Sequence, residues 1–169
     1  MRALKQAGWS IVYCDESGFE PDAPCLYGWS PRGVPVYGER SGERRPRENL
    51  LAARTRQEWL APLLFLGSVT AQLFEQWLSE QLIPSLLQPS VLVLDNAAFH
   101  RPHRVTELME QAGHRVLFLP PYSPDFNPIE GDFAALKKKR AYESDETSLD
   151  ELVASYQPQA GRLSRSYLK

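Results

Sequence analysis

The sequence predicts an α/β fold built on one mixed sheet, with antiparallel strands first, parallel strands later and helices flanking the sheet. Up to residue 66, β-branched and aromatic runs alternate with turn residues. From Thr70 onward, apolar residues recur at helical spacing between short, wholly apolar runs. The chain has 169 residues, 43% of them hydrophobic, which is enough to bury one complete core in a single domain.

The first strand is expected over residues 9–15 (WSIVYCD), a run rich in β-branched and aromatic residues. It is expected to end at the turn-forming Glu16-Ser-Gly18, so that Asp15 closes it. A turn at Pro31-Arg-Gly33 separates two further short strands, and a hairpin follows them. These four strands are expected over 25–30, 34–37, 49–55 and 59–66.

An amphipathic helix is expected from Thr70 to near Pro84, because apolar residues repeat there on one face. Residues 91–94 (VLVL) form a continuous apolar run, as in a strand covered on both faces, and the run stops at Asp95. Chemistry in such sheets gathers beyond the carboxyl ends of strands, which makes Asp15 and Asp95 candidate functional residues. The remaining elements are a helix at about 102–112, a strand at 116–119 and a helix from Asn127-Pro128 to about Arg140.

The net charge of −2, from 19 basic and 21 acidic residues, hides an uneven distribution. Residues 143–151 (ESDETSLDE) hold five acids and no base, which leaves 16 acids against 19 bases elsewhere. The bases gather in two clusters, which are either solvated surface or a contact for nucleic-acid phosphate. The clusters are Arg40, Arg44, Arg45 and Arg47, extended by Arg54 and Arg56, and the run from Lys137 to Arg140.

Nothing in the sequence predicts a secreted or membrane-bound protein. Cys14 and Cys25 are separated by ten residues without a CxxC pattern, which favours free thiols in a reducing cytosol. The longest apolar stretches, such as 60–67, are far shorter than the roughly 18 residues of a membrane span. The N-terminus lacks the apolar core of a signal peptide, so a cytoplasmic location is expected.

Three acids stand where the expected elements bring carboxylates together: Asp15, Asp95 and Glu130. Taken singly, each has a structural explanation. Asp15 and Asp95 could serve as turn or cap residues, and Asn127 to Glu130 fit a helix capping box. Taken together, they offer the hard oxygen ligands that Mg²⁺ prefers, and a pair of such ions can cleave a phosphodiester.

Four strings of the sequence stand out together: Asp15-Glu-Ser-Gly18, Gly28-Trp-Ser-Pro-Arg-Gly33, Leu94-Asp-Asn-Ala-Ala-Phe-His100 and Leu119-Pro-Pro-Tyr-Ser-Pro-Asp-Phe-Asn-Pro-Ile-Glu130. They resemble the catalytic domain of DDE transposases, in the mariner-like group of bacterial insertion sequences. The resemblance covers about residues 10–142, and its most specific part is the proline-rich string. The 34 residues between Asp95 and Glu130 are also typical of this group.

The resemblance implies an RNase H-like catalytic domain over residues 1–142, followed by an acidic, polar segment over 143–169. It implies that Asp15, Asp95 and Glu130 are catalytic and hold two Mg²⁺ (or Mn²⁺) ions. Water would then cleave the phosphodiester at each transposon end, and the freed 3′-hydroxyl would attack target DNA without a covalent protein–DNA intermediate. The helix-turn-helix domains that precede this core in relatives are expected to be absent, since the first strand begins close to the N-terminus.

The implied partners are double-stranded DNA, at transposon ends and at the target, and a second copy of the chain in a homodimer. The chain would be either the second reading frame of a split transposase gene, with a separately encoded N-terminal part that recognises the ends, or a truncated copy. No membrane is involved, and the expected location is the bacterial cytoplasm, in association with the nucleoid. DNA binding is expected of Arg44, Arg45, Arg47, Lys137 and Lys138. The residues expected to support the acids without binding the ions are Asn96, His100 and Asn127.

Functions of other classes stay open at this point. A thiol enzyme could use Cys14, His100 and Asp95, although no strained turn surrounds the cysteine. His100 and His103 have a spacing seen in zinc sites but lack a third soft ligand nearby. The chain could also be a catalytically silent transposase remnant that binds nucleic acid or another protein.

Three further acids neighbour the triad in sequence. Glu16 follows Asp15 directly and should point to the opposite face of its strand, because strand side chains alternate. Asp125 and Asp132 flank Glu130 and could replace it in a distorted site.

Overall fold

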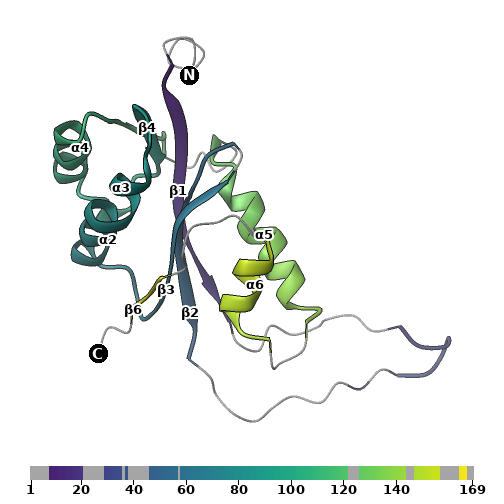
Figure 1. Cartoon of the computed structure of the whole chain (residues 1–169). Coiled ribbons are helices and arrows are strands. Elements are labelled where there is room, and N and C mark those ends of the chain that lie inside the picture. The colour runs from purple at the N-terminus through teal and green to yellow at the C-terminus, as the bar shows by residue number, and fades with distance from the viewer. Residues whose placement is uncertain are drawn as a thin grey trace.

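The computed structural model describes residues 8–20, 29–35, 37, 46–56, 58–121, 126–143, 147–156 and 164–166. Over these ranges the chain forms one sheet of six strands in the order β5-β4-β1-β2-β3-β6, with helices on both faces (Figure 1). The strands are β1 (Ser10–Phe19), β2 (Glu48–Arg54), β3 (Trp59–Leu66), β4 (Ser90–Leu94), β5 (Arg115–Phe118) and β6 (Ser164–Ser166). The helices are α2 (Ala71–Trp77), the π-helical η1 (Leu78–Leu82), α3 (Ile83–Ser85), the 3₁₀ turn η2 (Ala98–His100), α4 (Pro102–Gln111), α5 (Ile129–Arg140) and α6 (Leu149–Tyr156).

The sheet is antiparallel on one side of β1 and parallel on the other. β2 pairs with β1 and β3 in the antiparallel sense, whereas β4 pairs in parallel with β1 and with β5. The mixed sheet, with its early hairpin and later parallel strands, was predicted from the sequence and is confirmed. The β1–β4 ladder ends at Tyr13 and Val93, while β1 continues along β2 as far as Phe19.

The prediction that the first strand ends at Asp15 is wrong. The strand continues from Glu16 to Phe19 because all four residues pair with β2. The backbone hydrogen bonds of this ladder outweigh the turn tendency of Gly18. Asp15 therefore lies inside β1, just beyond the point where β4 leaves it.

The short strands expected over 25–30 and 34–37 are not found where the structure describes these ranges. Their described residues are irregular, and the turn predicted between them is confirmed by a hydrogen bond from Val34 N to Pro31 O at 3.0 Å. Trp29 is fully exposed, so its β tendency has no sheet face to pack against. The rest of the two ranges lies outside the described residues.

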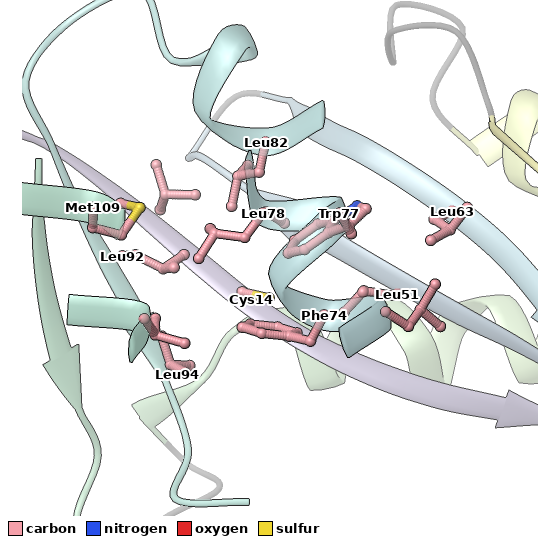
Figure 2. Packing of buried hydrophobic residues seen from close by; sticks show 14 of the residues in the cluster. Cys14, Leu51, Leu63, Phe74, Trp77, Leu78, Leu82, Leu92, Leu94 and Met109 are labelled. Atoms are coloured by element: carbon pink, nitrogen blue, oxygen red, sulfur yellow. The ribbon is translucent and has the colours of Figure 1, made fainter. Parts of the chain in front are cut away.

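One face of the sheet is covered by α2, η1 and α4. Their apolar side chains pack on residues of β1, β2 and β4 in one buried cluster (Figure 2). Thr70 caps α2, since its hydroxyl accepts a hydrogen bond from Leu73 N at 3.1 Å. The helical stretch from Thr70 to near Pro84 was predicted and is confirmed. The buried cluster includes Cys14, Leu51, Phe74, Trp77, Leu78, Leu82, Leu92, Leu94 and Met109.

The opposite face is covered by α5 and α6, which pack together in a second cluster (Figure 1). The buried residues of α5 recur at helical spacing and rest on β1, β2 and β3. The cluster comprises Ile129, Phe133 and Leu136 of α5, Leu149, Leu152 and Val153 of α6, and Phe19, Leu50, Ala52, Trp59 and Leu64 of the strands.

The segment 143–169, expected to be acidic and polar, thus supplies a helix to this second cluster. A capping box begins α6: Ser148 Oγ accepts a hydrogen bond from Glu151 N at 3.3 Å, and Glu151 Oε2 accepts one from Ser148 N at 2.9 Å. The Ser-x-x-Glu spacing, with apolar residues at helical intervals after it, was the sequence signal that could have revealed α6.

Candidate active site

Two of the predicted acids follow the last residue pair of the β1–β4 ladder. Asp15 comes two residues after Tyr13, and Asp95 comes two residues after Val93. Extending the parallel register by two residues would set Asp15 and Asp95 opposite each other on one face. In agreement, the charge of Asp95 is one of the causes that raise the pKa of Asp15. The Asp15 side chain is half-buried and that of Asp95 is exposed.

The third acid, Glu130, stands in the first turn of α5, and Asn127 ties the start of this helix to β1. The side-chain amide of Asn127 donates a hydrogen bond to the carbonyl oxygen of Cys14 at 3.2 Å. Ile129 is fully buried beneath the helix. Because Cys14 immediately precedes Asp15, the start of α5 and the first acid are held close together.

Asn127 does not cap α5, contrary to the capping-box interpretation. The helix begins at Ile129, its N-cap is Pro128, and no side chain in the described part of the chain caps it. The amide of Asn127 faces β1 instead, and its buried Oδ1 has no hydrogen-bond partner among the described residues. The carboxylate of Glu130 is exposed rather than turned back on the helix start.

Asp15 has the electrostatics of a carboxylate cluster. Its pKa is raised from 3.8 to about 7, chiefly by burial and next by the charge of Glu16. Asp95 and Glu130 act in the same direction, while a hydrogen bond from Glu16 N to Asp15 Oδ1, at 2.9 Å, lowers the pKa. A bound cation would relieve this mutual repulsion.

Asp95 is held by contacts within its own loop. Its Oδ1 accepts a hydrogen bond from Ala97 N at 3.1 Å, so Asp95 does stabilise a turn, as its sequence context allowed. His100 Nδ1 lies 3.1 Å from both the Oδ1 and the carbonyl oxygen of Asp95. The hydrogen bond from His100 is the main cause that lowers the pKa of Asp95. The buried His100 ring packs against Phe74 and Phe99, with centroids at 4.5 and 4.4 Å.

The donor set of Asp15, Asp95 and Glu130 suits a divalent, oxygen-binding cation. The charges of Asp95 and Glu130 both reach Asp15 at one end of the sheet, where they add to the burial that raises its pKa. In the described part of the chain, however, no group of three or more His, Cys, Asp or Glu side chains is already drawn together closely enough to hold a metal ion. Binding would therefore require the carboxylates to move closer together. The same finding gives no support to a zinc site at His100 and His103.

Asn96, expected to support the acids, links two loops of the site. Its side-chain amide donates a hydrogen bond to the carbonyl oxygen of Leu119 at 2.5 Å, and Leu119 N donates to Leu94 O at 2.8 Å. These bonds join the end of β4, next to Asp95, to the start of the proline-rich connection that leads to Glu130.

The basic residues at the end of α5 differ in their surroundings: some are exposed, and one bonds to another helix. Lys137 and Lys138 are exposed, and Lys137 Nζ lies 5.7 Å from the centre of the Phe19 ring. Lys139 instead donates a hydrogen bond to Ser155 Oγ of α6 at 2.7 Å. Two of the four cations therefore present their charge to solvent, as the DNA-binding prediction requires.

Arg47 lies on the wall of a cavity of about 530 Å³ that Phe99 also lines. The Arg47 guanidinium rests against Gly18, where any larger side chain would collide with it. Its Nε is 3.6 Å from Glu20 Oε1, and both side chains are largely exposed. The predicted DNA-binding residues Arg44 and Arg45 lie outside the described residues, as does Asp125.

Asp132, which could have replaced Glu130, is engaged in a different network. Its Oδ2 accepts hydrogen bonds from Arg54 Nη1 at 2.5 Å and from Trp59 Nε1 at 3.1 Å, and its Oδ1 accepts one from Tyr156 at 3.0 Å. These bonds join β2, β3, α5 and α6, so Asp132 secures the helix that carries Glu130. Its partners are 24 to 78 residues away, and no local spacing signals them.

Thiol chemistry at Cys14 is contradicted by its surroundings. The side chain is 1% exposed and lies in the cluster beneath α2 (Figure 2). Burial raises the pKa of the thiol well above its usual 9.0, and neighbouring carboxylates raise it further. A buried thiol that stays protonated is not a nucleophile.

Comparison with known proteins identifies the family. A family model described as DDE superfamily endonuclease matches residues 10–153. The chain belongs to the DDE superfamily endonucleases. The assignment made from the four sequence strings is thereby confirmed, and a search of curated proteins gave no match.

The fold of this DDE chain is similar to that of the Mos1 mariner transposase in several solved structures. For the paired-end complex with Mn, the TM-score is 0.71 and the identity 19%, over 94% of this chain and 51% of that one. For the isolated catalytic domain, the TM-score is 0.63 and the identity 17%, over 94% of this chain and 75% of that one. For the strand transfer complex, the TM-score is 0.61 and the identity 18%, over 92% of this chain and 55% of that one. This likeness confirms the expected RNase H-like fold, and the chain spans about half the length of the transposase in the paired-end complex.

Proposed function

We propose that this chain is the catalytic domain of a DNA transposase, which cuts phosphodiester bonds at transposon ends and joins the freed 3′-hydroxyl to target DNA by two-metal-ion catalysis. The observation that carries the proposal is the placement of the three acids: Asp15 and Asp95 each follow the end of the β1–β4 ladder by two residues, and Asn127 ties the start of α5, which carries Glu130, to the residue before Asp15. These acids come from distant parts of the chain, and β1, β4 and α5 bring them to one end of the sheet. The endonuclease family and the fold likeness to the Mos1 transposase support the same function.

In this proposal Asp15, Asp95 and Glu130 are the catalytic residues and hold two Mg²⁺ or Mn²⁺ ions through their carboxylate oxygens. When bound, such ions activate the attacking water and stabilise the leaving oxygen. The chain's own task is to hold three carboxylates at one end of the sheet, despite the burial and the repulsion that raise the pKa of Asp15.

Three hydrogen-bonding side chains are proposed to position the acids without touching the ions. His100 holds Asp95 directly, through Nδ1. The other two act through the backbone, because they fasten the loop after β4 and the start of α5 to their neighbours. The three residues are Asn96, His100 and Asn127.

Double-stranded DNA is the proposed substrate, both at transposon ends and at the target. Exposed cations would bind its phosphates, and these are proposed to be Arg44, Arg45, Arg47, Lys137 and Lys138. A homodimer would hold two ends together, and a separately encoded N-terminal part would recognise them. The proposed place of action is the nucleoid of the bacterial cytoplasm, where that DNA lies. Within the described ranges, no helix is both long enough and apolar enough to cross a membrane.

Nicking of supercoiled plasmid DNA in the presence of Mn²⁺ tests the proposal. The wild-type chain is expected to produce open circles, and Asp95→Asn, which keeps the shape of the side chain but not its charge, is expected to lose this activity. Glu110→Gln removes an exposed carboxylate of α4 and is the matched control. Nicking at the wild-type rate by Asp95→Asn would overturn the proposal. A wild-type chain that neither binds Mn²⁺ nor nicks DNA would be the catalytically silent remnant instead.

A further inference from the structure

We infer that Glu16, a carboxylate outside the proposed metal-binding triad, pairs with His100 and thereby fixes the orientation of Asp95. Glu16 is in this sense a positioning residue, since it acts on Asp95 through the imidazole. The inference rests on the proposed function, because it assigns Asp95 the role of a metal ligand.

Glu16 and His100 each bury a polar atom that has no hydrogen-bond partner among the residues that the structure describes. The two atoms are Glu16 Oε2 and His100 Nε2, and the His100 side chain is only 1% exposed. A buried polar atom without a hydrogen-bond partner destabilises the fold. One of these atoms belongs to a carboxyl group and the other to an imidazole, so each can satisfy the other.

The packing brings the two groups to the same face of the sheet. The His100 ring packs against Phe74, with a centroid distance of 4.5 Å, and Phe74 belongs to the cluster that covers the face of β1 on which Cys14 lies. Glu16 shares a strand face with Cys14, because alternate residues of β1 point the same way. That face is covered by the cluster to which Phe99, the neighbour of His100, belongs, and Glu16 and Phe99 line one cavity.

The contacts of His100 Nδ1 determine how Nε2 can bond. Nδ1 lies 3.1 Å from the carbonyl oxygen of Asp95, which has no proton to give, so a hydrogen bond there requires the proton on Nδ1. In the neutral ring, Nε2 then offers a lone pair to a protonated Glu16. In the charged ring, Nε2 donates its proton to an ionised Glu16. A single proton links the pair in both states, so the pairing does not depend on which group carries it.

Asp95 is an exposed acid that depends on such support. Its side chain is 55% exposed, and within the described structure its carboxylate is held by Ala97 N and by His100. An imidazole anchored at both nitrogens keeps its plane, and with it the direction in which Nδ1 holds Asp95. Outer partners of this kind change metal affinity about 10–100-fold when they are removed.

Mn²⁺ binding to the full chain, followed by the electron paramagnetic resonance of free Mn²⁺, tests the inference. Glu16→Met keeps the length of the side chain but cannot pair, and it is expected to weaken Mn²⁺ binding about 10–100-fold. Glu16→Gln keeps a hydrogen-bonding head and is expected to retain most of the affinity. Glu110→Gln is again the control and is expected to bind as the wild type does.

A double-mutant cycle shows whether Glu16 acts through His100. His100→Phe keeps an aromatic ring against Phe74 and Phe99 but removes both nitrogens. The double variant Glu16→Met/His100→Phe is expected to bind Mn²⁺ as weakly as His100→Phe alone. Losses that multiply, or full affinity in Glu16→Met, would overturn the inference. If Asp95→Asn keeps wild-type Mn²⁺ affinity, it is the proposed function that fails, which separates the two outcomes.

Discussion

A hydrogen bond from the amide of Asn127 to the carbonyl oxygen of Cys14 joins two points of the chain that are 113 residues apart. One end adjoins Asp15 in β1, and the other lies three residues before Glu130. This side-chain amide therefore helps to set the spacing between these two acids, which agrees with the supporting role expected of Asn127, although its sequence context suggested a helix cap.

Asn127→Ala is expected to lower the free energy of unfolding by about 1–3 kcal/mol, because it removes a partner from a buried carbonyl group. It is also expected to weaken Mn²⁺ binding, since the start of α5 loses its tether to β1. Urea denaturation and Mn²⁺ titration measure the two effects. Asn49→Ala removes an exposed amide bonded to Gly67 O and serves as the control. Unchanged Mn²⁺ affinity in Asn127→Ala would show that the tether does not place Glu130.

Asp132→Ala is expected to lower the free energy of unfolding by about 2–4 kcal/mol. The reason is that Arg54, whose side chain is only 23% exposed, is left without its carboxylate partner. Tyr156→Phe removes one neutral donor from the same network and is expected to cost about 1 kcal/mol. Urea denaturation ranks these variants against Glu143→Ala, which removes an exposed acid beyond α5. Equal stability of Asp132→Ala and Glu143→Ala would contradict the structural role.

Asp15→Asn is expected to stabilise the metal-free chain at neutral and higher pH. The folded chain holds the proton of Asp15 up to a pKa of about 7, whereas the unfolded chain releases it near 3.8. Stability is therefore lost as the pH rises between these values and stays low above them. The variant cannot ionise and should exceed the wild type by up to about 4 kcal/mol above pH 7, with no difference below about pH 4. Thermal melting across this range measures the gap, and a gap independent of pH would refute the expectation.

Gly131→Ala is expected to raise the free energy of unfolding by about 1 kcal/mol, because glycine is a poor helix former. Gly131 is exposed in the first turn of α5, and an added Cβ would meet no atom within 4 Å. Ala134→Gly, at an exposed position one turn further on, is expected to have the opposite effect of similar size. Guanidinium denaturation compares the two variants, and a loss of stability in Gly131→Ala would mean that its backbone is not helical.

Features with a local pattern could be predicted from the sequence. The apolar run 91–94 predicted β4, and the helical spacing of apolar residues after Thr70 predicted α2. Both predictions succeeded because the burial of a strand or of one helix face produces a local pattern of apolar residues in the sequence. Asp15, Asp95 and Glu130 stood out through motif strings, each complete within a few residues. The structure places Asp95 and Glu130 near enough to Asp15 for their charges to act on it, although the described residues contain no group of three or more such side chains that could already hold a metal ion.

Features that depend on distant partners could not be predicted in this way. The extension of β1 to Phe19 depends on pairing with β2, and the network of Asp132 depends on Arg54 and Tyr156. The contact of His100 with Asp95 spans only five residues, but no spacing in the sequence indicates that its other nitrogen, Nε2, is buried without a hydrogen-bond partner among the described residues. Turn propensity and capping patterns pointed elsewhere at Asp15 and Asn127, because tertiary bonds overrode them.

The packing around Trp59 imposes an order on the folding of this chain during synthesis. The ring of Trp59 contacts Phe133 and Tyr156, each with a centroid distance of 5.7 Å, and its indole nitrogen bonds to Asp132, 73 residues later. The β2–β3 hairpin therefore leaves the ribosome long before its cover is made. Contacts between residues so distant in sequence slow folding. The side chain of Trp59 therefore stays uncovered until residue 156 has been translated. This interval is when the nascent chain is most open to chaperones and proteases.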